Sequence, residues 1–369
     1  MLPVSAALVM LALAAQTQDP KAAYTRALQL EKEGNHPAAL ALLWEAAGQA
    51  PRDADIQNRL GEALDRIGAL DAAIDAYQRA VAARLDFVAA DNNLTLALAK
   101  AGRGREAVER ARGRANADPA NVDRLFTLGL AQSEQDVDEA MTTFRRVIAL
   151  RPDDALALYN LGLLLKRVDR TRDAIDALQR ALAIEPRPEV RFALGTLYLH
   201  EGDFGRATKA LEAALAAQPR AVDGYITLAA VLKAKGQLPE SIDALRRAIA
   251  LQPDSWSAHA ALATTLQTAG EAAAAHQETV VAERLRVQAA LEREATTWTA
   301  VGIARLEAGD PAQAAERFRR ALSVFDAYAP AHYQLGRALA LLGRGDDARA
   351  AFARARQLNP SLVPPDAMK

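Results

Sequence analysis

The residue types that could catalyse a reaction or hold a metal are few in this chain of 369 residues, and they lie far apart. No two of the five histidines have the short helical spacing that a shared metal ion requires. The histidines are His36, His200, His259, His276 and His332. Because the sequence has no cysteine, disulfides, thiolate metal sites and cysteine nucleophiles are excluded. We therefore predict no catalytic residue, no cofactor, no cofactor-binding residue and no metal site, and we do not expect an enzyme.

Two short motifs resemble known binding sequences but have a simpler interpretation. Gly102-Arg103-Gly104-Arg105 lacks the downstream lysine and serine or threonine of a phosphate-binding loop. Arg344-Gly345-Asp346 spells a cell-adhesion tripeptide, and it falls at the equivalent place in the last copy of the repeat described below. We interpret both motifs as turns between helices.

Charge argues against nucleic acid as a partner. The 45 Lys and Arg residues balance 46 Asp and Glu residues, so the formal net charge is -1. A nucleic-acid-binding surface needs clustered positive charge, and the sequence contains no basic block. A protein or peptide is the expected partner.

One pattern repeats along the chain. A small residue recurs at ten places, directly after an apolar residue at nine of them, and these places are 33 or 34 residues apart except for a single interval of 39. A second column, mostly alanine and eleven or twelve residues further on, has the same period and the same long interval. The first column consists of Ala27, Gly61, Thr95, Gly129, Gly162, Gly195, Ala229, Ala263, Gly302 and Gly336. We number the copies as repeats one to ten.

These columns resemble the tetratricopeptide repeat family, whose unit of 34 residues has a small residue at position 8, alanines at positions 20 and 27 and a proline at position 32. The resemblance covers Pro20 to Pro360. It implies a right-handed α-solenoid of about ten antiparallel helix-turn-helix units. The composition, rich in Ala and Leu with 5% aromatic residues, independently indicates an all-α fold. A single hairpin cannot bury its apolar side, so neighbouring hairpins must stack.

The stacking pattern breaks after repeat eight. Positions 21 and 28 should face the following repeat, and they are Ile74 and Val81 in repeat two but His276 and Glu283 in repeat eight. Residues 271–294 contain neither glycine nor proline, which predicts one extended helix of about 36 Å. We expect four segments: an apolar N-terminal segment (1–19), an array of repeats one to eight (20–294), an array of repeats nine and ten (295–360) and a tail (361–369).

The N-terminal segment has the features of a secretory signal. Met1 to Ala15 are almost continuously apolar and are followed by polar residues, which favours cleavage after Ala14 or Ala15. We expect an exported protein, periplasmic or secreted from a bacterium-like cell, whose mature chain does not insert into a membrane. Because Lys and Arg are missing near Met1, an uncleaved N-terminal anchor and a cytoplasmic chain stay open as alternatives.

In the tetratricopeptide family, positions 2, 5, 9, 12 and 13 of each first helix line a concave groove. At positions 5 and 9 the central repeats carry large apolar residues, with basic residues around them. This predicted groove consists of Phe126, Leu130, Tyr159, Leu163 and Phe192, together with Lys166, Arg167, His200 and Lys233. It would suit an extended or helical segment with apolar anchors and acidic residues. The alternative is that the aromatic residues pack against the neighbouring helix and expose little surface.

The sequence therefore predicts a non-catalytic protein–protein interaction scaffold that binds a peptide or protein segment in its concave groove. The alternative function is a structural assembly or self-association module within a multiprotein envelope complex, acting through repeat eight and the long helix. The oligomeric state is not predicted. His259 and His332 both occupy position 4 of a first helix, where we expect a structural role.

Overall fold

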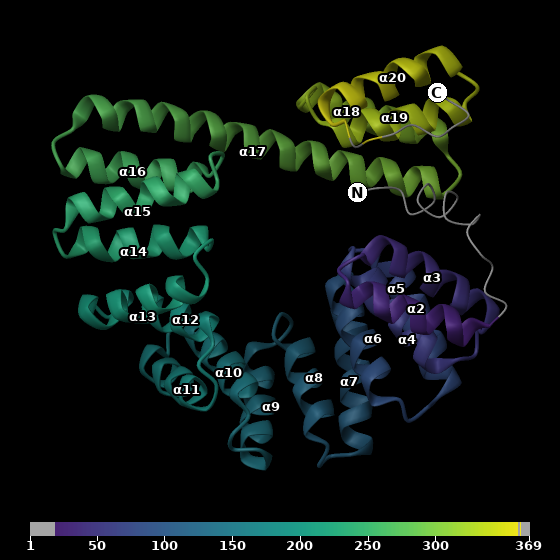
Figure 1. The fold of residues 1–369 in the computed structure, drawn as a ribbon, viewed down its shortest axis with the longest axis horizontal. Coiled ribbons are helices and arrows are strands. Elements are labelled where there is room, and N and C mark those ends of the chain that lie inside the picture. Colours follow the sequence, from purple (N-terminus) through teal and green to yellow (C-terminus); the bar gives the residue numbers. More distant parts are fainter. Residues whose placement is uncertain (1–18, 361, 363–369) are drawn as a thin grey trace. The chain divides into compact units, whose positions relative to one another are not determined.

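The computed structural model describes residues 19–360 and residue 362, and these form nineteen α-helices and no strand (Figure 1). The predicted all-α class is confirmed. Contacts divide the chain into two compact modules, with the boundary between Pro219 and Arg220. We call residues 19–219 the N-terminal module, and residues 220–360 with 362 the C-terminal module. The predicted signal, except Asp19, and the predicted tail, except Leu362, lie outside the described residues.

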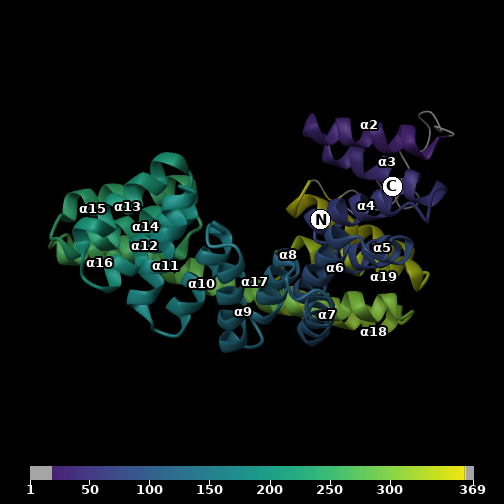
Figure 2. The ribbon, with the colours of Figure 1, turned by 90° about the horizontal axis from the view of Figure 1, so that it is seen from below.

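The N-terminal module consists of six helical hairpins, repeats one to six. Its helices are α2 (Pro20–Lys32), α3 (His36–Gln49), α4 (Ala54–Arg66), α5 (Leu70–Ala83), α6 (Val88–Lys100), α7 (Gly104–Ala117), α8 (Val122–Gln132), α9 (Val137–Leu150), α10 (Ala155–Arg167), α11 (Thr171–Ile184), α12 (Pro188–His200) and α13 (Phe204–Ala217). The first helix of each repeat packs against its own second helix, and each second helix packs against the next first helix (Figure 2). The hairpins therefore stack in sequence order, as the repeat pattern predicted.

The C-terminal module contains repeats seven to ten. Its helices are α14 (Val222–Ala234), α15 (Leu238–Leu251), α16 (Trp256–Thr268), α17 (Ala272–Glu307), α18 (Pro311–Val324), α19 (Ala329–Leu341) and α20 (Gly345–Leu358). Within the described residues, none of the helices is both long enough and apolar enough to cross a membrane.

The predicted long helix exists but is longer than the sequence indicated. Helix α17 has 36 residues, about 54 Å at 1.5 Å per residue, and continues past Glu294 to Glu307. It supplies both the second helix of repeat eight and the first helix of repeat nine. The predicted end at Glu294 was wrong because Gly302 stays helical and the helix ends only before Gly309, which has a φ of 78°. The predicted packing break after repeat eight is confirmed, because repeats eight and nine share one helix. The predicted array boundary between residues 294 and 295 falls inside that helix and stays a prediction.

The small residue at position 8 allows the two helices of a hairpin to approach closely. A Cβ atom on Gly61 would lie 2.5 Å from the ring of Tyr77, and one on Gly162 would lie 2.7 Å from Leu178. Tyr77 and Leu178 are fully buried, so neither can move aside without disturbing the core. Glycine also ends most first helices at a positive φ, and Asp169 takes that role in repeat five with a φ of 56°.

Two glycine substitutions test this packing. Gly61→Ala should destabilise the protein by about 1–3 kcal/mol because the new methyl group overlaps Tyr77. Gly113→Ala is the matched control, since Gly113 also lies inside a helix but has open space around it. The control should stabilise the protein by roughly 0.5–1 kcal/mol through helix propensity. Chemical denaturation measures both changes, and equal effects of the two substitutions would contradict the packing argument.

Candidate partner-binding surface

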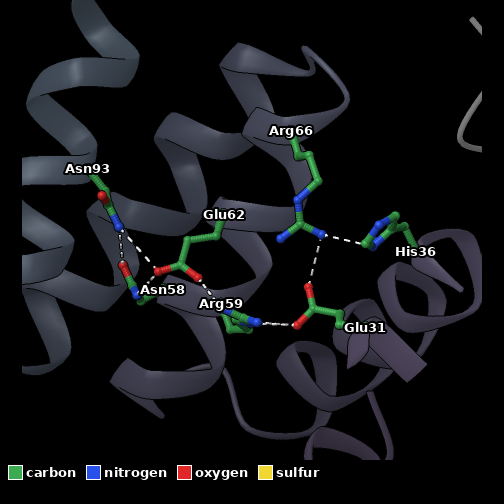
Figure 3. A network of polar contacts seen from close by, with 7 residues as sticks. All are labelled: Glu31, His36, Asn58, Arg59, Glu62, Arg66 and Asn93. Carbon is green, nitrogen blue, oxygen red and sulfur yellow. Dashed lines mark hydrogen bonds and ion pairs between the residues drawn. The ribbon is translucent and has the colours of Figure 1, made fainter. Parts of the chain in front are cut away.

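A network of charged side chains joins the first three repeats (Figure 3). At one end of it, Glu31 of α2 lies between two arginines of α4 and is only 6% exposed. Arg59 Nε donates to Glu31 Oε2 at 2.7 Å, and Arg66 Nη1 donates to Glu31 Oε1 at 3.2 Å. Arg66 Nη1 also lies 3.2 Å from Nδ1 of His36, which accepts when its proton is on Nε2. One buried carboxylate therefore ties α2 to α4.

The same network continues from α4 to α6 through amide side chains. Glu62 accepts hydrogen bonds from Arg59 Nη1 at 2.6 Å and from Asn58 Nδ2 at 2.9 Å. Asn93 Nδ2 on α6 lies 3.2 Å from Asn58 Oδ1 and 3.4 Å from Glu62 Oε1. Two carboxylates and two guanidinium groups balance here, and most of their hydrogen bonds stay within the network. This part of the surface holds the first helices in register.

The apolar residues of the predicted groove come from three successive first helices. Phe126 and Leu130 lie on α8, Tyr159 and Leu163 on α10, and Phe192 on α12; all five are partly exposed. The Phe126 ring packs edge-on against Phe144 of the same hairpin, with centroids 5.6 Å apart and planes at 75°. Phe126 therefore packs on its neighbour and still presents apolar surface, and binding by these residues stays a prediction.

The basic residues around this apolar surface differ in how they are held. Lys166 Nζ lies 3.2 Å from Thr196 Oγ1 of the next repeat. Arg167 Nη1 donates to the carbonyl oxygen of Ser133 at 2.7 Å and to Glu134 Oε1 at 3.3 Å. Glu134 is highly exposed, so this ion pair contributes little and leaves Arg167 able to bind another carboxylate. His200 is exposed at the last residue of α12.

Glu189 adds a negative charge that the sequence interpretation missed. Burial raises the pKa of Tyr159, and the nearby Glu189 carboxylate raises it further, against the opposing effect of Arg187. Glu189 itself has a lowered pKa, first because of a backbone hydrogen bond and then because Gln218 Nε2 donates to it at 2.7 Å. At neutral pH the Tyr159 hydroxyl is therefore protonated beside an ionised carboxylate. The signal was available, because Glu189 occupies position 2, one of the groove positions.

Lys233 belongs to the C-terminal module, so the nine predicted residues form two separate sets. Lys233 lies on a pocket of about 430 Å³ between α14 and α16, and its Nζ donates to the carbonyl oxygen of Thr264 at 3.2 Å. The other lining residues are mostly small, among them Ala230, Ala261 and Thr268. The pocket exists because the groove positions of these helices carry small side chains.

The two histidines at position 4 have the structural role that their position predicted. His259 Nδ1 lies 2.6 Å from Glu278 Oε2, and its Nε2 lies 3.1 Å from the carbonyl oxygen of Pro253. His332 Nε2 donates to the carbonyl oxygen of Asp326 at 2.8 Å. Both rings are buried and fix the chain that enters a first helix.

Comparisons with known proteins agree with the repeat pattern. A family model described as a tetratricopeptide repeat matches residues 24–87, 159–222 and 299–362, together more than half of the chain. A second tetratricopeptide repeat model matches residues 198–266, and a model described as a TPR repeat matches residues 133–169. The chain belongs to the tetratricopeptide repeat family. Its repeats support a role as a protein-interaction scaffold.

Three curated relatives match over part of their length. Protein O-mannosyl-transferase Tmtc3 of Drosophila melanogaster is 32% identical over 127 residues, which are 34% of this chain and 14% of the relative. The peroxisomal targeting signal receptors of Candida albicans and Eremothecium gossypii are 29% and 31% identical, over 30% and 34% of this chain and 19% and 22% of the receptors. This chain spans less than a quarter of each of these relatives.

The fold also matches a solved structure. A tetratricopeptide repeat protein from Parabacteroides merdae superposes with a TM-score of 0.52 and 15% sequence identity, covering 67% of this chain and 98% of that chain. At this identity the match concerns the fold alone, and it agrees with an all-α solenoid.

The Glu31 network generates a stability prediction. Glu31→Gln should destabilise the N-terminal module by about 1–2 kcal/mol, because two arginines lose the carboxylate between them. Glu283→Gln is the control, since Glu283 forms an exposed pair with Arg286 within one helix, and its substitution should leave the unfolding midpoint unchanged. Thermal unfolding followed by circular dichroism measures both. An unchanged midpoint for Glu31→Gln would show that the network has no role in stability.

Proposed function

We propose that the chain is a non-catalytic scaffold whose N-terminal module binds a peptide or protein segment along the groove of α8, α10 and α12. The observation that carries the proposal is the apolar surface of Phe126, Leu130, Tyr159, Leu163 and Phe192, partly exposed on three consecutive first helices. Covering partly exposed aromatic side chains contributes roughly 1 kcal/mol each. Three such rings give a binding site for apolar anchor residues.

The surroundings of this surface favour acidic residues in the bound segment. Lys166, Arg167 and His200 are exposed beside the apolar side chains. Glu189 limits the positive field at α12, so the preference for acidic residues should concentrate near α10. The neighbouring surface of α2, α4 and α6 is charge-balanced and bonded internally, and it offers fewer free groups.

The pocket of the C-terminal module supports a second contact of the same kind. Its small lining residues admit an aliphatic side chain, and Lys233 can pair with a carboxylate at its edge. Two of the matched relatives are named as receptors for a targeting signal, which is compatible with peptide binding by repeats of this family. The match to a named transferase covers 14% of that protein and does not favour catalysis here.

A peptide-library selection tests the groove. Purified chain is panned against phage-displayed random peptides, and the affinities of the selected peptides are measured by fluorescence anisotropy. The selected peptides should combine apolar residues with Asp or Glu. Phe126→Ala combined with Tyr159→Ala should raise Kd about tenfold or more while helical content stays unchanged.

The control is Leu150→Ala, because Leu150 is 48% exposed but lies on a second helix. It should leave Kd unchanged. If the selected peptides bind the Phe126 and Tyr159 variant with unchanged affinity but bind Ala230→Trp more weakly, the binding site lies in the pocket of the C-terminal module. Selection of peptides without acidic residues, bound equally by all variants, would contradict the proposed groove.

We further propose that the chain is exported. The support is the apolar run from Met1 to Ala15 and the polar residues after it. N-terminal sequencing of the protein purified from its native cells should show a chain that begins after Ala14 or Ala15. A chain that retains residues 1–14 in the cytosolic fraction would contradict export.

A further inference from the structure

The middle of α17 is a length of helix that no neighbouring helix covers. Between Ala282 and Ala295, which are both buried, every described residue is exposed or partly exposed. Two large apolar residues stand out in this stretch, Val287 at 47% and Leu291 at 36% exposed, and Val280, just before it, is 55% exposed. Exposed apolar residues on one side of a stable helix are typical of a surface that binds a partner.

The repeat register explains why this surface is open. Where a repeat precedes it in the stack, a first helix buries a leucine at position 7 and another side chain, mostly leucine, at position 11, as with Leu60 and Leu64 in repeat two. In repeat nine these positions are Val301, which is 39% exposed, and Arg305, which is exposed. Because α17 is continuous, the faces of repeats eight and nine that would pack together lie on one and the same helix. They cannot meet within the chain.

The spacing of the residues along this face is that of a coiled-coil seam. Residues 280, 284, 287, 291, 294 and 298 are separated by alternating steps of four and three, which places them on one side of the helix. They are Val280, Arg284, Val287, Leu291, Glu294 and Trp298. Trp298 is only partly exposed, because it packs against the cluster of Ala295, Ala321 and Ala331, and Arg317 and Arg320 each lie 5.8 Å from its ring centroid. The seam is symmetric about residue 289: Val287 and Leu291 lie two residues from it, Arg284 and Glu294 five, and Val280 and Trp298 nine.

This symmetry favours a second copy of α17, in antiparallel orientation, as the partner of the seam. If a second copy of α17 lies antiparallel with the two-fold axis at residue 289, Val287 faces Leu291 of the second copy and Val280 faces Trp298. Arg284 then faces Glu294, so opposite charges meet, and each contact forms twice. A parallel arrangement would place Arg284 against Arg284 and Glu294 against Glu294, which is repulsive. Arg284 and Glu294 are both exposed, although Glu294 Oε1 also lies 3.4 Å from Trp298 Nε1.

We propose that the chain forms an antiparallel two-fold dimer through this seam of α17, whose central residues Arg284, Val287, Leu291 and Glu294 are exposed. The pairing gives repeat eight of one copy and repeat nine of the other the helix neighbour that each lacks in its own chain. The groove of the N-terminal module is on different helices, so dimerisation and peptide binding are separate properties of the protein.

Cysteine crosslinking tests the orientation, and the natural absence of cysteine removes any background. Chains that carry Arg284→Cys are mixed with chains that carry Glu294→Cys and are oxidised. In the antiparallel dimer the mixture should form a covalent dimer, whereas each variant alone should not, since its two cysteines would lie about 15 Å apart. A covalent dimer of each variant alone, or no covalent dimer in the mixture, would overturn the proposal.

Charge reversal with light scattering tests the dimer itself. At tens of micromolar concentration, the particles of the wild-type protein should have twice the mass of a single chain. Arg284→Glu and Glu294→Arg should each raise the dimer Kd about tenfold or more, and the double substitution should restore dimerisation. Arg293→Glu is the control, because Arg293 is exposed on the same helix but off the seam, and it should leave the mass unchanged.

Circular dichroism confirms that each variant is folded. A monomeric wild-type chain, or charge-reversed variants with unchanged mass, would contradict the dimer.

Discussion

The whole structure depends on one constraint: the apolar side of each helical hairpin is covered by the next hairpin in the sequence. A hairpin of two amphipathic helices cannot bury both its own interface and its outer apolar residues, so its stability comes from its neighbours. Tyr77 fills the space left by Gly61 within repeat two, and Leu60 and Leu64 of the same repeat are buried as the repeats stack. Where stacking stops, on α17, the equivalent positions are Val301 and Arg305, and both are exposed.

This constraint also distinguishes the residues that hold the hairpins together from those that remain partly exposed on the first helices. Residues that hold hairpins together are buried apolar groups or paired charges, such as Glu31 between its two arginines. The first helices of repeats four to six differ, because their outward positions carry Phe126, Tyr159 and Phe192, which the stack covers only partly. In the proposed function, these partly exposed side chains would form the binding surface without a change in how the hairpins stack.

Much of the fold could be predicted from the sequence, because the small residues at position 8 recur with a period that only stacked hairpins explain. The two histidines at position 4 were also placed correctly, since position in the repeat determines burial.

The full length of α17 could not be predicted, because no residue type marks where a helix continues through a junction. The module boundary at Pro219 was missed for a similar reason: a proline closes most repeats and does not distinguish this one. The network around Glu31 depends on side chains 28 and 35 residues apart, which a single sequence does not pair. The groove residues were predicted through the family resemblance and stay a prediction, and Glu189 was missed because the interpretation concentrated on apolar and basic residues.

Hydrogen–deuterium exchange along the chain tests the central claim most directly, namely that each helix is protected by its stacked neighbours. In dilute solution, amides of α5 and α9, which have helices on both sides, should exchange slowly, and those of residues 283–294 in α17 should exchange fastest among the helix interiors. Uniform protection along α17 under dilute conditions, or rapid exchange in α5 and α9, would contradict the account.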